Sequence, residues 1–307
     1  MQRVVVLVGP TSVGKSNLAL RLSKRFDGEI VGADSRQVYR YMDIGTAKPT
    51  PEDRRAVSHH LIDIIDPDEH FSLAQYQQLA YEAIADVSGR HKLPLLVGGT
   101  GQYIWAVLEG WDVPKVAPEF ALRRQLEERA ASGEATELYV ELQAIDRNAA
   151  NKIDPRNVRR IIRAIEVSKT TGTPFSELQK RKAPPFRTLI IGLTTERSEL
   201  YGRTDSRVDR MMKEGLVEEV RRLIEMGYGL NLPSMSGIGY RQIGEHLNGK
   251  ADLESAVRKI KTETHRFVRH QYNWFRLGDE RIRWFDIRDD DMEKKVVTEI
   301  MRSVSTE

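Results

Sequence analysis

The chain has 307 residues, 40% of them apolar, which is enough for one large domain or two modest domains with packed cores. It contains no cysteine, so a disulfide framework, a thiolate zinc site and a thiol nucleophile are excluded, and we expect a reducing, cytoplasmic setting. No stretch approaches the roughly 20 apolar residues of a membrane span, and the N-terminus has no signal-peptide pattern, so we expect no membrane partner.

The first predicted element is a buried strand at Val4–Val8, followed by the loop GPTSVGKS and a helical pattern from Ser16 to Phe26. This strand, loop and helix match the G-x-x-x-x-G-K-S motif, in which backbone N–H groups cradle phosphate oxygens. Lys15 would neutralise phosphate charge, and the Ser16 hydroxyl could hold Mg²⁺. The phosphate-binding residues predicted by the motif are Gly9, Pro10, Thr11, Ser12, Val13, Gly14, Lys15 and Ser16. The loop alone does not say which phosphate compound binds.

Two further strands are predicted at 28–35 and 92–101. Strands separated by helices are typical of a parallel sheet, whose ligands bind beyond the carboxyl ends of the strands. Asp34 and Thr100 follow these strands, so we expect both beside the phosphate loop. Asp34 is a candidate Mg²⁺ ligand, ribose contact, general base or simple turn residue, and Thr100 is a candidate hydrogen-bonding residue in a flexible or merely tight glycine turn.

The remainder of the chain indicates an α/β fold with a helical insertion. Residues 114–185 are charged and helical, with amphipathic patterns at 119–133 and at 155–172, where Gly172 is a plausible helix stop. We therefore predict a catalytic core formed by 1–113 and 186–307, and an inserted helical subdomain at 114–185. Later elements are predicted as strands at 187–195 and 281–287 and helices at 198–226 (broken near Gly215), 252–275 and 291–304.

Seven motifs, in their order and spacing, resemble the bacterial tRNA dimethylallyltransferase family, also called tRNA isopentenyltransferase or IPP transferase. They are GPTSVGKS, DSRQVYR, HHLID, GGTGQY, RRIIRAIEV, GIGYRQ and FVRHQYNWFR, and they extend over nearly the whole chain. The departures are slight: Val13 and Ser16 vary within the loop, and Gln102 stands where leucine is usual. The resemblance implies a P-loop NTPase-like parallel sheet with helices on both faces.

The family resemblance also implies a reaction. Such enzymes transfer a dimethylallyl group from dimethylallyl diphosphate to the exocyclic amine, N6, of the adenosine 3′-adjacent to the anticodon. Lys15 and Mg²⁺ would then stabilise the diphosphate leaving group. Asp34 would act as general base, and Thr100 would position Asp34 or the adenine amine. Arg203 and Arg207 share a helix face and are further candidate diphosphate ligands, the alternative being a solvated basic face.

The same resemblance makes the anticodon stem-loop of tRNA the expected partner of a monomeric enzyme. The target base must leave its stack, and the predicted tRNA-binding residues are Asp34, Ser35, Arg36, Gln37, Thr100, Arg159, Arg160 and Arg163. Basic residues of the 252–275 helix could also contact RNA phosphates. Tyr272, Trp274 and Phe275 either stack on nucleotides or form a buried stripe.

Two other classes of protein remain open from the residues alone. A small-molecule or nucleoside kinase would bind ATP in the same loop, but it leaves the basic surfaces unexplained. A non-catalytic NTP switch or RNA-binding module leaves Asp34 and Thr100 without a task. The adjacent His59 and His60 do not have zinc-site spacing, so we interpret them as structural or substrate-lining.

Overall fold

The computed structural model describes residues 2–114, 116, 119–178 and 181–305. The chain forms two compact units, one made of Met1–Leu108 with Pro184–Glu307 and the other of Glu109–Ala183. The first unit carries the whole sheet. No helix among the described residues is long and apolar enough to cross a membrane.

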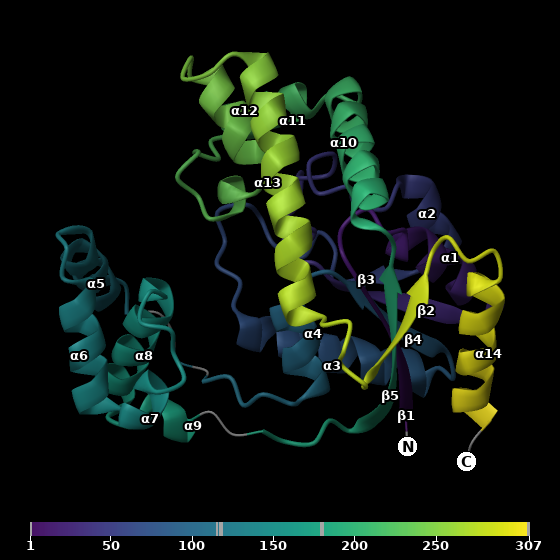
Figure 1. Cartoon of the computed structure of the whole chain (residues 1–307), viewed down its shortest axis with the longest axis horizontal. Helices are drawn as coiled ribbons and strands as arrows, with labels where there is room; N and C mark the ends of the chain where they lie inside the picture. The colour runs from purple at the N-terminus through teal and green to yellow at the C-terminus, as the bar shows by residue number, and fades with distance from the viewer. Residues whose placement is uncertain (1, 115, 117–118, 179–180, 306–307) are drawn as a thin grey trace. The chain divides into compact units, whose positions relative to one another are not determined.

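The first unit is built on a six-stranded parallel sheet with the strand order β3-β2-β4-β1-β5-β6 (Figure 1). The strands are β1 (Gln2–Val8), β2 (Gly28–Ala33), β3 (His59–His60), β4 (Leu93–Gly98), β5 (Phe186–Thr194) and β6 (Ile282–Asp286). The α/β prediction is confirmed, and so are five of these strands. The sequence missed β3, because a two-residue edge strand has no measurable periodicity.

Helices cover both faces of this sheet. Side chains alternate along each strand, so Val5 and Leu7 of β1 face one side, where they join the core formed with α1 (Lys15–Arg25) and α14 (Met292–Ser305). The other face meets α3 (Leu73–Gly89) and α4 (Gly101–Leu108), which pack against β4. Because both faces are covered, the strands are almost continuously apolar.

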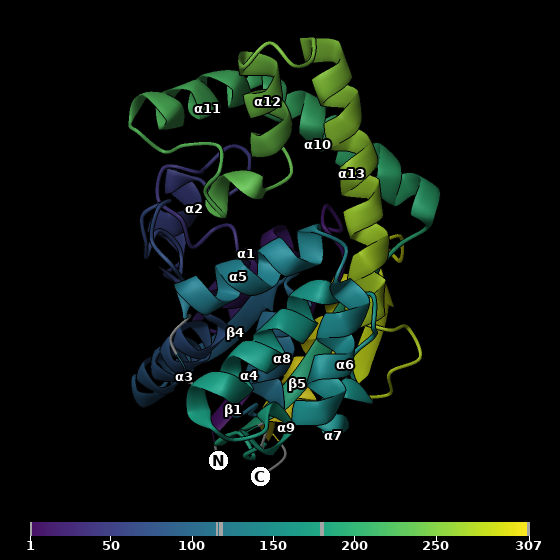
Figure 2. The same ribbon diagram turned by 90° about the vertical axis from the view of Figure 1, so that its left-hand side faces the viewer.

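A helical cluster follows β5 in the same unit. Its elements are α10 (Arg197–Lys213), α11 (Leu216–Glu225), the 3₁₀ helix η1 (Ser234–Ser236), α12 (Tyr240–Leu247) and α13 (Leu253–Trp274). Figure 2 shows α11, α12 and the first turns of α13 gathered together. The predicted break at Gly215 is confirmed: this residue has φ 100°, a left-handed conformation that glycine adopts without strain.

The second unit is a small helical bundle with its own core. It contains α5 (Phe120–Ala131), α6 (Ala135–Ile145), α7 (Arg147–Ala150), α8 (Val158–Thr171) and α9 (Phe175–Leu178). Leu126, Leu138 and Ile161 are fully buried within it. Gly172 ends α8 in the left-handed conformation, as predicted.

A long loop joins β2 to β3 and contains the short helix α2 (Pro51–Ala56). Lys48 of this loop is buried, with its side chain 1% exposed. Its Nζ donates to the Tyr39 carbonyl at 2.5 Å and to the Asp63 carboxylate at 2.5 Å. Within the HHLID motif, Asp63 is therefore a structural residue that pairs with Lys48.

The same loop is tied to α11 by Glu219, which is 2% exposed. Its carboxylate accepts from the backbone N–H groups of Asp43, Ile44 and Gly45 at 2.9, 2.8 and 3.1 Å. A fourth donor is the hydroxyl of Tyr240, at 2.6 Å. Among the described residues, the carboxylate is held by these four donors and by no cation, and it joins the loop to α11 and α12.

We expect Glu219→Ala to destabilise the protein strongly. The substitution leaves several buried donors without an acceptor, at a cost of about 1–3 kcal/mol each, so the free energy of unfolding should fall by about 3 kcal/mol or more. Urea unfolding measures it, with the exposed neighbour Glu218→Ala as the matched control. Equal midpoints for the two variants would contradict this assignment.

Candidate active site

Three loops meet at the carboxyl ends of β1, β2 and β4, which are adjacent in the sheet. Ala33 at the end of β2 is in register with Gly98 at the end of β4. Beyond them, the Thr100 N–H donates to the Ala33 carbonyl at 3.2 Å, and the Thr100 hydroxyl accepts from Ser35 N–H at 3.0 Å. The segments of Asp34 and Thr100 are thus brought together, as the strand order predicts.

The loop Gly9–Gly14 after β1 leads directly into α1. Gly9 has φ 139°, and a Cβ there would lie 2.5 Å from the Leu193 carbonyl oxygen, so no larger residue fits. Gly14, with φ 100°, precedes the helix and offers no capping side chain. The first N–H groups of α1 therefore remain available to an anion.

Within this loop the residues have different roles. The Lys15 ammonium donates to the carbonyls of Gly9 and Pro10 at 2.9 and 2.8 Å. Pro10 has no N–H, and the N–H of Thr11 donates to Gln271 Oε1 at 2.8 Å. Ser12 has φ 66°, and among the described residues its buried hydroxyl has no hydrogen-bond partner.

Three charged groups interact in this site. Burial, reinforced by the charge of Arg207 and opposed by that of Asp34, lowers the pKa of Lys15 from 10.5 to about 7. Burial likewise lowers the pKa of Arg207, and Asp34 again opposes the shift. Lys15, Arg207 and Asp34 are therefore close enough to influence one another electrostatically.

The structure distinguishes the arginines of α10. Arg203 is exposed and forms an ion pair with Glu199 at 2.8 Å. Arg210 is also exposed, and its Nε lies 3.8 Å from a carboxylate oxygen of Glu214. Arg207 is half-buried and is the arginine that interacts electrostatically with Lys15. Diphosphate contacts of both Arg203 and Arg207 stay predictions, and Arg207 has the better placement.

The lowered pKa of Lys15 predicts that the binding of an anionic substrate depends on pH. The protonated ammonium is the form that binds an anion, and the free enzyme loses this form as the pH rises through about 7. For the diphosphate substrate that the family resemblance implies, we expect kcat/KM, which at saturating RNA reports the enzyme with RNA but without diphosphate, to fall on the alkaline side of about pH 7. A pH profile at saturating RNA measures it, and a flat profile between pH 6 and 9 would contradict it.

The DSRQ segment is more constrained than the sequence suggested. One carboxylate oxygen of Asp34 accepts from the Arg36 N–H at 2.8 Å. The Arg36 guanidinium donates to the Pro233 carbonyl at 2.7 Å, and Gln37 Nε2 donates to the carbonyls of Thr46 and Ala47 at 3.1 Å. These side chains hold the loop in place, a role that the sequence did not reveal.

Two tyrosines next to Asp34 also escaped sequence reasoning. Tyr76 of α3 and Tyr103 of α4 stack with ring centroids 3.7 Å apart, and the Tyr76 hydroxyl donates to the Gly32 carbonyl. Burial raises the pKa of both phenols, with a smaller contribution from Asp34 in each case. Both phenols therefore stay neutral, and both lie close enough to Asp34 to sense its charge.

The aromatic residues at the end of α13 belong to the packing of the first unit. Phe275 is 1% exposed, the Tyr272 hydroxyl lies 2.9 Å from Thr194 Oγ1, and the Trp274 carbonyl accepts from Trp105 Nε1 at 2.9 Å. The buried-stripe interpretation fits these contacts better than nucleotide stacking. Arg266 and Arg269 lie on the exposed part of the helix.

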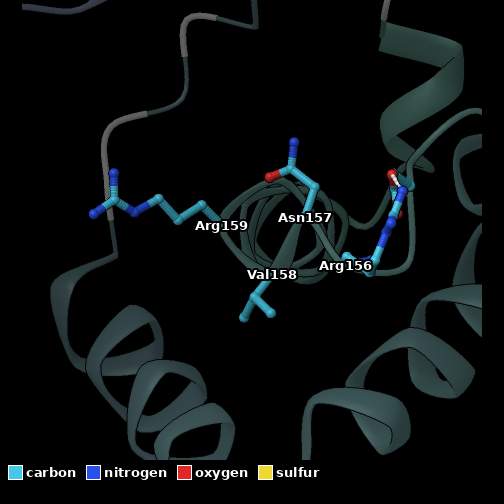
Figure 3. A pocket seen from close by; sticks show the side chains of 5 residues that line it. Arg156, Asn157, Val158 and Arg159 are labelled. Atoms are coloured by element: carbon cyan, nitrogen blue, oxygen red, sulfur yellow. Dashed lines mark hydrogen bonds and ion pairs between the residues drawn. The ribbon is translucent and has the colours of Figure 1, made fainter. Parts of the chain in front are cut away.

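In the second unit, the start of α8 borders a hollow of about 420 Å³. Figure 3 shows Arg156 and Arg159 extending to opposite sides of the helix start. Arg156 forms an ion pair with Asp154 at 2.8 Å. Arg159 and Arg160 are exposed and make no ion pair with any described residue.

Arg163 differs from its neighbours on α8. Its guanidinium donates to the buried Glu166 at 2.9 Å and to the Val116 carbonyl at 2.9 Å. Its predicted RNA contact would have to compete with these bonds. Within the described part of the chain no cluster of three histidine or acidic residues could hold a metal ion, and His60 instead pairs with Glu29 at 2.8 Å.

Comparison with known proteins agrees with this geometry. The family model described as IPP transferase matches residues 37–278. A tRNA dimethylallyltransferase of Roseiflexus castenholzii is 56% identical over 273 residues, which is 89% of each chain. The chain belongs to the IPP transferase family. The tRNA dimethylallyltransferase of Thermomicrobium roseum is 49% identical and covers 99% of this chain and 92% of its own.

Solved structures of this family have the same fold. A tRNA isopentenylpyrophosphate transferase from Bacillus halodurans is 38% identical, with a TM-score of 0.72 over 99% of this chain and 98% of that one. A eukaryotic dimethylallyltransferase acting on tRNA is 27% identical, with a TM-score of 0.81 over 97% of this chain and 78% of that one. IPP transferase membership supports the P-loop NTPase-like fold and does not support the kinase alternative.

Proposed function

We propose that this enzyme transfers a dimethylallyl group from dimethylallyl diphosphate to N6 of the adenosine 3′-adjacent to the anticodon in tRNA. The observation that carries the proposal is the convergence of Lys15 and Arg207 with the Asp34 carboxylate, in a chain of the IPP transferase family. Two cations suit an anionic leaving group, and one carboxylate suits the removal of a proton. The cytoplasm, where tRNA is used, is the corresponding compartment.

The leaving group would be held by the phosphate loop. As the bond between the allylic carbon and the diphosphate oxygen breaks, negative charge grows on that oxygen, which leaves with the electron pair. The N–H groups at the start of α1, the Lys15 ammonium and the Arg207 guanidinium would stabilise this charge. Buried Ser12 Oγ is a further donor for a phosphate oxygen.

A divalent cation fits the same loop. Ser16 lies at the first turn of α1, and its exposed hydroxyl is an oxygen ligand of the kind that Mg²⁺ accepts. When bound, Mg²⁺ would neutralise part of the diphosphate charge.

The adenine amine would form the new bond to the allylic carbon and lose its proton to Asp34. The Thr100 hydroxyl accepts from the Ser35 N–H and so fixes the backbone beside Asp34, which supports a positioning role for Thr100. The buried Tyr76 and Tyr103 lie close enough to sense the Asp34 charge and stay neutral themselves. A base turned out of the anticodon loop could reach this group, whereas a stacked base could not.

The second unit would contribute RNA affinity through Arg159 and Arg160. Both are exposed and are not neutralised by any described acidic residue, unlike Arg163. Such arginines suit phosphate contacts, which raise affinity without reading sequence.

We expect Arg159→Ala/Arg160→Ala to weaken binding of the anticodon stem-loop and to flatten its salt dependence. Each lost phosphate contact should reduce the slope of log K against log salt by about 0.7–0.9. The control is Lys24→Ala/Arg25→Ala, at the end of α1 away from the phosphate loop. If the two double variants bind RNA alike in a salt titration, the α8 surface does not contact RNA.

The direct test of function mixes enzyme and Mg²⁺ with unmodified anticodon stem-loop RNA and radiolabelled dimethylallyl diphosphate. Parallel reactions contain labelled ATP instead. Label that enters the RNA from the allylic donor without ATP supports the proposal. ATP turnover onto a small acceptor, with no allylic transfer, would overturn it.

A further inference from the structure

The last turn of α13 places one amide between the two halves of the site. Gln271 is 2% exposed. Its Nε2 donates to the Gly99 carbonyl at 3.0 Å, and its Oε1 accepts from the Thr11 N–H at 2.8 Å. Thr11 belongs to the phosphate loop, and Gly99 directly precedes Thr100. A single side chain therefore bridges the phosphate loop and the turn that carries Thr100.

The bridge requires both a donor and an acceptor at this point. The Gly99 carbonyl can only accept, and the Thr11 N–H can only donate, so a side chain with separate donor and acceptor atoms, such as an amide, satisfies both. A carboxylate cannot donate to Gly99 when ionised, and an ammonium cannot accept from Thr11. The buried position leaves little room for water to replace a missing bond.

The surroundings of the amide are shaped to receive it. A Cβ at Gly99 would lie 2.3 Å from Gln271 Nε2, so glycine permits this close approach. One helical turn later, Trp274 fits against Gly101, where a Cβ would lie 2.2 Å from the indole. The end of α13 is thus seated on the turn that carries Thr100, which fixes the direction of the Gln271 side chain.

We propose that Gln271 is a positioning residue that sets the spacing between the phosphate loop and the Thr100 turn. The proposal rests on the proposed function, because only that reaction has the diphosphate on the phosphate loop and the RNA base beside the Thr100 turn. Bond formation between substrates held on separate loops depends on their mutual distance, and a misplacement of about 1 Å can cost about 10²-fold in rate. The residue acts through the backbone and need not touch either substrate.

The main test replaces the amide by a side chain of similar length without hydrogen-bonding capacity, Gln271→Met. We expect kcat to fall about 10–100-fold, as expected for lost alignment. Affinities for inorganic pyrophosphate and for stem-loop RNA, each measured alone, should stay within about threefold, since each loop keeps its own ligands. The matched control is Asn273→Met, an exposed amide on the same helix end, which should leave kcat unchanged.

A double-mutant cycle separates the bridge from general packing. Gly99→Ala places a methyl group against the amide and should lower kcat as Gln271→Met does. If both act by breaking one bridge, the double variant should be no slower than the slower single variant. Additive losses, a kcat of Gln271→Met within threefold of the parent, or ligand affinities that fall together with the melting temperature would overturn the proposal.

Hydrogen exchange keeps this test independent of the proposed reaction. Peptides covering residues 9–14 and 98–101 should exchange faster in Gln271→Met than in Asn273→Met. If the parent transfers no dimethylallyl group, the proposed function fails, while faster exchange of both peptides would still support the bridge. Unchanged exchange would refute the bridge whatever the reaction.

Discussion

Replacing Asp34 by asparagine should lower the rate of dimethylallyl transfer by about 10²–10⁴-fold, the usual contribution of a general base. The amide keeps the size of the side chain and can still accept the Arg36 N–H, so the turn after β2 should persist. What it loses is the ability to take the proton that leaves the adenine amine. The measurement is single-turnover transfer into stem-loop RNA at saturating donor.

The controls for this prediction are RNA affinity and a second carboxylate. RNA affinity of Asp34→Asn should remain within a few-fold of the parent, because the segment keeps its backbone contacts to Thr100. Asp68→Asn, at an exposed position beyond the same loop, should transfer normally. Transfer by Asp34→Asn at the parent rate, with unchanged RNA affinity, would remove Asp34 from the mechanism.

Replacing Lys15 by methionine should nearly abolish transfer and at the same time stabilise the fold. The lost ammonium acts on the leaving group, and removal of one such preorganised donor typically costs about 10²–10³ in rate. Pyrophosphate affinity should fall as well, because the cation contributes to binding. Ser12→Ala, which removes a neutral donor, should cost less.

The gain in stability follows from the direction of the pKa shift. The pKa of Lys15 is about 7 in the folded protein and near 10.5 in the unfolded chain. Between these two pH values the unfolded state therefore binds more protons than the folded state. Stability contributed by this residue therefore rises with pH across that window, and the cost is fully present below about pH 7. Each pKa unit is about 1.4 kcal/mol, so methionine should raise the unfolding free energy by up to a few kcal/mol at neutral pH.

Thermal unfolding at pH 6.5 and pH 10 checks the stability prediction. Lys15→Met should melt above the parent at pH 6.5, and the difference should shrink at pH 10. Methionine also removes the bonds to Gly9 and Pro10, which oppose the gain. A variant that melts below the parent at both pH values would show that these bonds outweigh the burial of charge.

The sequence predicted the sheet well, because its strands are buried on both faces and stand out as apolar runs between glycine turns. The order of those strands was not available from periodicity, yet it is what places Asp34, Thr100 and Lys15 together. The break at Gly215 and the stop at Gly172 were predictable, since left-handed helix ends favour glycine. Short elements such as β3 and η1 were not, because two or three residues carry no period.

The chemistry of the site was predictable only where a motif specifies it. GPTSVGKS indicates a phosphate loop by its spacing, but nothing near Arg203, Arg207 or Arg210 shows which arginine faces it. That distinction depends on the helix direction and on the partners Glu199 and Glu214. Gln271 lies 260 residues from Thr11, and no local pattern connects them.

The Glu219 contact has a consequence for exchanging parts between relatives. The loop after β2 is held from outside by α11, through Glu219, and by the segment at Ser234, through Arg36. Residues 34–66 therefore cannot be exchanged alone between homologous enzymes, because their conformation depends on Glu219 and Ser234, which lie nearly 200 positions later in the chain. A chimera that moves this loop should carry α11, η1 and α12 from the same parent, and the natural unit of recombination in this enzyme is discontinuous in sequence.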